Sequence, residues 1–97
     1  MGENAFKASM AQGQPPAEFS LALQALWWAE KGDWQKAHRC AQAQDDAIGA
    51  LVHGCLHREE GDLANAGYWY ARAGKPAATG LLAVERDEIA CALLGGT

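Results

Sequence analysis

A seven-residue pattern occurs twice in this chain, each time between two segments with helical periodicity. The first copy spans residues 31–37 (KGDWQKA) and the second spans residues 60–66 (EGDLANA), so Gly32 and Gly61 lie 29 positions apart. In each copy the glycine can adopt the left-handed backbone that ends a helix, and the aspartate after it can cap the next helix. Repetition at a period of a few tens of residues is typical of stacked helical hairpins.

Hydrophobic periodicity along the rest of the chain predicts an all-α protein with five helices and no strand. The helices are expected at residues 17–31, 34–42, 47–60, 63–73 and 77–94. In the last helix, Leu81, Leu82, Ile89 and Leu93 form an apolar stripe, and residues 85–88 are expected on the solvated side. Residues 1–16 show little periodicity and are expected to be a flexible arm, which could include one helical turn around Phe6 and Met10. Residues 17–97 then form a single helical domain.

The size, charge and hydropathy of the chain disfavour several classes of function. The chain has 97 residues and 49% apolar content, which suits one small globular domain. Its net charge of −4 and scattered basic residues do not favour a nucleic-acid partner. No apolar run approaches the roughly 20 residues of a membrane span, and no secretory signal precedes the domain. We therefore expect a cytoplasmic protein, with Cys40, Cys55 and Cys91 reduced and buried.

Small and aromatic residues around both copies of the pattern resemble the tetratricopeptide repeat. The matching positions in the second copy are Gly54, Gly61, Asp62, Leu63, Ala66, Tyr70, Ala73 and Pro76, and those in the first copy are Ala25, Trp28, Gly32, Asp33, Trp34 and Ala37. The match covers residues 18–76 and departs at Gln44, where the family has a small residue. The resemblance implies an α–α superhelix of two antiparallel hairpins with the fifth helix as a cap. It also implies a concave groove that binds peptides or protein surfaces.

One apolar stripe on the helix at residues 47–60 faces this groove if the family register holds. The expected lining is Phe19, Leu26, Ile48, Leu51 and Cys55, with Arg58 and Glu59 at the edge. An apolar groove surface of this kind is expected to be packed against another segment or molecule. The fifth helix, the N-terminal arm, a second copy of the chain, and a foreign helix or peptide are the alternatives. Coverage from within the chain or in a homodimer is favoured over a foreign ligand.

Three histidines form the only cluster of chemical interest in the sequence. His53 and His57 lie one helical turn apart, and His38 is on the side of its helix expected to face them. The favoured interpretation is structural, with rings bonded to backbone carbonyls or Tyr hydroxyls, so neither a metal nor another cofactor is expected. A metal site is the alternative, and a general base or pH switch is a third. The metalloprotease motif requires a glutamate directly after its first histidine, and Gly54 follows His53 in this chain.

Trp27 and Trp69 are extra aromatics relative to the family pattern. They are expected either to pack against a neighbouring hairpin or to act as interface anchors. The sequence contains no catalytic triad, phosphate-binding glycine loop or nucleotide fingerprint. It therefore predicts a non-enzymatic protein–protein interaction module that self-associates. The alternative function is a small metal-binding or catalytic protein that uses His38, His53 and His57.

Overall fold

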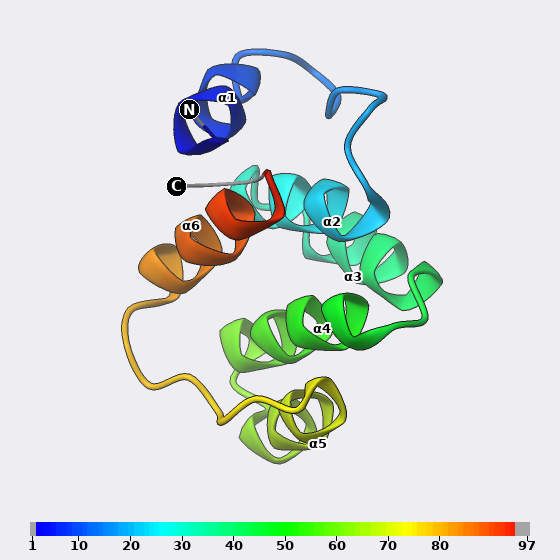
Figure 1. Cartoon of the computed structure of the whole chain (residues 1–97), viewed down its shortest axis with the longest axis vertical. Coiled ribbons are helices and arrows are strands. Elements are labelled where there is room, and N and C mark those ends of the chain that lie inside the picture. The colour runs from blue at the N-terminus through cyan, green and yellow to red at the C-terminus, as the bar shows by residue number, and fades with distance from the viewer. Residues whose placement is uncertain (1, 95–97) are drawn as a thin grey trace.

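A computed structural model of the chain describes residues 2–94, with side chains from residue 6 onward (Figure 1). Within these residues the chain forms six α-helices and no strand, so the all-α prediction is confirmed. The helices are α1 (Gly2–Ser9), α2 (Leu21–Glu30), α3 (Trp34–Ala43), α4 (Ala47–Glu60), α5 (Leu63–Ala73) and α6 (Leu82–Leu93). The last residues of the predicted domain, 95–97, lie outside the described part.

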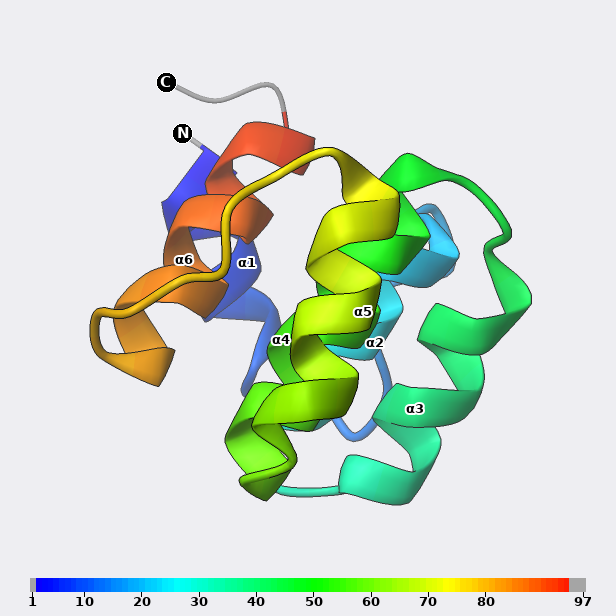
Figure 2. The same ribbon diagram turned by 90° about the horizontal axis from the view of Figure 1, so that it is seen from below.

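Both copies of the repeated pattern lie at helix boundaries, as predicted. Gly32 and Gly61 have φ values of +87° and +90°, in the left-handed region that favours glycine. The carboxylate of Asp33 accepts a hydrogen bond from the backbone N–H of Lys36, and Asp62 caps α5 in the same way. The short turns leave α2 packed beside α3, and α4 packed beside α5 (Figure 2).

The contact between α4 and α5 is close because small residues face it. A Cβ atom built on Gly54 would lie 3.2 Å from the Tyr70 ring and 3.3 Å from the carbonyl oxygen of Ala66. Ala66 itself is buried. The close approach fixes the rotation of α4, so its other faces turn toward α2, α3 and α6.

Residues 2–16 fall in the expected flexible arm, but they contain α1, which packs against α6 (Figure 1). Phe6 is buried and stacks on Phe19, with ring centroids 6.4 Å apart. The indole Nε1 of Trp27 donates a hydrogen bond to Ser9 Oγ at 3.0 Å. The physical reason for the difference is tertiary. One aromatic ring and one hydroxyl hold a helix that is too short to show periodicity in the sequence.

Helix α6 begins at Leu82, five residues later than predicted, and residues 75–80 form an irregular connector. Leu81, expected in the apolar stripe, is 75% exposed because it precedes the first turn of the helix. Glu85, expected on the solvated side, is only 8% exposed. The side of α6 that packs on the rest of the protein therefore includes both Glu85 and Ile89, one helical turn apart.

A polar cluster ties α6 to three other helices. Glu85 accepts hydrogen bonds from Arg58 Nη1 at 2.8 Å and from the Tyr70 hydroxyl, and Arg58 also donates to the carbonyl of Gly80. Arg86 pairs with Glu30 at 2.9 Å and with Glu59 at 2.8 Å. A buried carboxylate is tolerated here because its oxygens have donors.

Gln44 links the starts of two helices. Its side-chain oxygen accepts a hydrogen bond from the backbone N–H of Ala22, in the first turn of α2, at 2.8 Å. Its side-chain nitrogen donates to the carboxylate of Asp46, the residue that caps α4. None of the helices in the described part of the chain combines the length and apolarity that a membrane span requires.

Candidate metal centre

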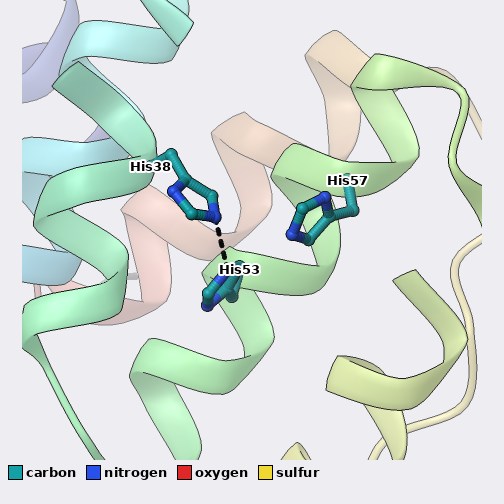
Figure 3. A group of neighbouring side chains, drawn as sticks. All are labelled: His38, His53 and His57. Carbon is teal, nitrogen blue, oxygen red and sulfur yellow. Dashed lines mark hydrogen bonds between the residues drawn. The ribbon is translucent and has the colours of Figure 1, made fainter. Parts of the chain in front are cut away.

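His38, His53 and His57 converge between α3 and α4. One ring nitrogen from each histidine lies within 4.8 Å of those from the other two. The Nε2 atoms of His38 and His53 share a hydrogen bond at 2.8 Å (Figure 3). His53 and His57 are buried and His38 is half-buried. The cluster therefore joins two helices and retains one partly accessible member.

The helical spacing accounts for two of the three positions. His53 and His57 are separated by four residues of α4, so their rings lie one above the other, with centroids 4.9 Å apart and planes 18° apart. His38 follows Ala37, which is fully buried and lets α3 approach its neighbours closely. The packing of α3 on α4 brings the third ring to the pair.

Two tryptophans hold the rings in place. Trp34 stacks on His38 with centroids 4.9 Å apart, and its Nε1 donates to the backbone carbonyl of Leu56 at 2.9 Å. Trp69 stacks on His53 with centroids 3.9 Å apart and planes 10° apart. Because these rings come from α3 and α5, the three helices α3, α4 and α5 together restrict the motion of the imidazoles.

A carboxylate orients the third histidine. Nδ1 of His57 lies 3.0 Å from Oε1 of Glu60, one turn further along α4. With its proton on Nδ1, the ring donates to the carboxylate and keeps the lone pair of Nε2 available. Histidines that bind metals usually have this kind of outer carboxylate or carbonyl partner.

The environment favours the neutral forms of His38 and His53. Burial, together with the neighbouring rings of His38 and His57, lowers the pKa of His53 to about 4. Burial also lowers the pKa of His38, with His57 adding to the effect and Glu60 opposing it. Neutral rings retain the lone pairs that metal coordination requires.

The arrangement fits a tetrahedral metal ion after a small adjustment. With Zn–N bonds of 2.0–2.1 Å, two imidazole nitrogens in a tetrahedral site lie about 3.3 Å apart. The His38–His53 pair is closer, at 2.8 Å, because its nitrogens share a proton. An ion could enter if the ring that donates this hydrogen bond moved its proton from Nε2 to Nδ1 and the two rings separated slightly. A second group, formed by His57, Glu60 and Asp62, is a poorer candidate because both of its carboxylates are exposed.

The residues expected to line a partner groove are mostly covered by the chain itself. Leu26 and Cys55 are fully buried, and Phe19 packs against Phe6 of α1. Leu51 is half-buried, and Ile48 is 41% exposed at the start of α4. Arg58 and Glu59, expected at the groove edge, bind Glu85 and Arg86 of α6. The structure does not bring these residues together as an open surface, because α6 packs against both α2 and α4.

The two surplus tryptophans have different environments. Trp27 is fully buried, makes an edge contact with Trp28, and is bonded to Ser9 of α1. Trp69 is half-buried and covers His53. Trp27 is thus part of the core, whereas Trp69 forms one wall of the histidine cluster.

Sequence reasoning did not identify Glu60 or Trp34 as parts of the histidine cluster. Both lie at helical spacing from a histidine, since Glu60 follows His57 by three residues and Trp34 precedes His38 by four. That spacing is the signal that was available. Trp69 was recognised as surplus, but its partner lies on a different helix, so no local pattern points to it.

No family model matches the chain, and searches of curated proteins and solved structures found no significant match.

Proposed function

We propose that this protein binds a divalent transition-metal ion of the zinc type through His38, His53 and His57. The observation that carries the proposal is the convergence of three ring nitrogens within 4.8 Å, from two helices. Imidazole suits zinc, copper and nickel, whereas magnesium and calcium prefer oxygen ligands. The group contains only nitrogen donors, so it favours the former class.

The contacts around the cluster support the proposal. Trp34, Trp69 and Glu60 each hold one of the three rings. A site held in this way loses little side-chain freedom when it binds an ion. The principal competitor is a purely structural cluster, in which the His38–His53 hydrogen bond satisfies one ring nitrogen of each histidine and no ion enters.

A thermal-shift titration separates the two possibilities. The metal-stripped protein is titrated with Zn²⁺, and we expect its melting temperature to rise in a saturable manner because the ion binds only the folded state. His38→Ala removes one donor from a half-buried position and should abolish the shift. Glu88→Gln, an exposed change on α6, should retain it. If the melting temperature of the wild-type protein does not respond to Zn²⁺, Cu²⁺ or Ni²⁺, the cluster is structural.

We also propose that residues 18–76 are a divergent pair of tetratricopeptide-like hairpins, with α6 as the cap. What supports this is the recurrence of a glycine turn, an aspartate cap and a buried alanine in each helix pair. Groove binding to a protein, a peptide or a second copy of the chain stays a prediction. No described contact favours it, because Leu26 and Cys55 are buried in the core and Arg58 and Glu59 are paired with residues of α6.

A further inference from the structure

We propose that the three-histidine site is an open one, in which a bound ion retains one coordination position for a small monodentate anion. This inference rests on the proposed metal binding and adds to it the kind of ligand that the ion would accept. The donors around His38, His53 and His57 decide how many positions on the ion the protein can fill.

The protein supplies three donors and no fourth. Among the residues that the structure describes, the group formed by the three histidines includes no cysteine or carboxylate. Structural zinc sites have four protein ligands, whereas sites with three keep a solvent molecule in the remaining position. The donor count of this cluster therefore matches the open class.

The nearest carboxylates are already engaged. Glu60 lies against Nδ1 of His57, on the opposite edge of the ring from Nε2. A carboxylate on that edge cannot also reach an ion bound at Nε2 unless the imidazole turns over. Asp62 caps α5 by accepting from the backbone N–H of Asn65. Recruiting either residue as a fourth ligand would break an existing contact.

The other neighbours of the cluster are not metal ligands. An indole N–H is a donor only, so neither Trp34 nor Trp69 can coordinate a cation. The indole N–H of Trp34 is also bonded to Leu56. Cys55 is fully buried and faces Glu85. Because His38 is half-buried, solvent has access to the cluster on the side of α3. The fourth ligand is therefore solvent, which a small anion such as azide can replace.

Cobalt substitution tests the inference on the intact wild-type chain. Co²⁺ is added to the metal-stripped protein and the visible spectrum is recorded, first alone and then during a titration with sodium azide in chloride-free buffer. We expect cobalt bands at one ion per chain and a saturable change in those bands with azide. Zn²⁺ should remove both the bands and the azide response, which would show that the two ions share one site.

The outcomes distinguish the inference from the proposed function. A cobalt spectrum that azide leaves unchanged would mean a closed site, and would overturn this inference while keeping metal binding. The absence of any cobalt or zinc binding would overturn both. His38→Ala serves as the control and should lose the cobalt bands. If this variant kept the bands and the azide response, the ion would not be held by these histidines, and the assignment would fail.

Discussion

The Nε2 atoms of His38 and His53 lie 2.8 Å apart, although the two residues belong to different helices. A hydrogen bond between them requires one nitrogen to be protonated and the other to be a free acceptor, so the neutral pair shares a single proton. If both rings were charged, two cations would meet at hydrogen-bond distance. The pair therefore links the protonation state of the protein to the packing of α3 on α4.

Acid should destabilise the metal-free protein through this pair. The pKa of His53 is about 4 in the folded state against an ordinary value of 6.5, so the unfolded chain binds more protons between these pH values. The free energy of unfolding then rises with pH across this window. The contribution of His53 to it is lost as the pH falls from about 6.5 to 4 and below. The loss at full protonation of His53 is on the order of 3 kcal/mol. Urea unfolding at pH 7, 6, 5 and 4 in the presence of a chelator measures it.

A variant identifies the origin of that pH dependence. His38 and His57 are the titratable groups that face His53, and both disfavour its charged form. His53→Gln removes the buried titrating ring and should flatten the stability profile between pH 4 and 6.5. An unchanged slope in this variant would place the acid sensitivity elsewhere in the chain.

Glu60→Gln should weaken metal binding without weakening the fold. The neutral amide no longer favours the proton on Nδ1 of His57, and loss of such an outer partner typically costs about 10–100-fold in affinity. The side chain of Glu60 is 45% exposed, so the change in the free energy of unfolding without metal should stay within about 0.5 kcal/mol. Calorimetric Zn²⁺ titration and urea unfolding measure the two quantities. Glu88→Gln is the matched control, and equal Zn²⁺ affinities in the two variants would contradict the role of Glu60.

Two glycines should respond to alanine in opposite directions. Gly61 has φ +90° and open space around it, so Gly61→Ala introduces backbone strain and should destabilise the fold by about 1–2 kcal/mol. Gly67 lies inside α5 with nothing near the position of a Cβ atom, so Gly67→Ala should stabilise the fold by roughly 0.5–1 kcal/mol. Denaturant unfolding of both variants measures the difference. Changes of the same sign would contradict a bend at Gly61 or a regular helix at Gly67.

Glu85→Ala should be among the most damaging single changes in the chain. It leaves Arg58 and Tyr70 without their common acceptor in a buried position, which typically costs about 3–5 kcal/mol. Glu88→Ala, three residues later on the exposed side of α6, should cost less than about 0.5 kcal/mol. Thermal and urea unfolding compare the two variants. Similar losses would indicate that α6 is not held through Glu85.

Local signals predicted most of the helix boundaries. The predicted ranges of α4 and α5, residues 47–60 and 63–73, agree with the structure because Gly61 and Gly74 end helices and Asp62 starts one. The start of α6 was wrong because residues 77–79 are two alanines and a threonine, which suit a helix locally. In the structure Arg58 holds the carbonyl of Gly80 from a different helix, and no local pattern encodes that bond.

Local spacing also predicted the histidines of the candidate site, but not the residues from other helices that surround them. His53 and His57 were paired by spacing alone, and His38 by the side of its helix that faces them. The burial of His53 depends on Trp69, and their contact requires the packing of α5 on α4. The burial of Glu85 likewise depends on Arg58 and Tyr70, which lie 27 and 15 residues away. Contacts between residues this far apart in the sequence form only when the helices pack together, so local patterns do not predict them.

Gln44 is the position at which the resemblance to the repeat family departs, and its amide spans from the first turn of α2 to the capping residue of α4. A small side chain would be too short to reach both. Sliding α4 relative to α2 would therefore break at least one of these two bonds. Because Gln44 directly follows the last residue of α3, the same side chain also ties the end of the helix that carries His38 to the starts of α2 and α4.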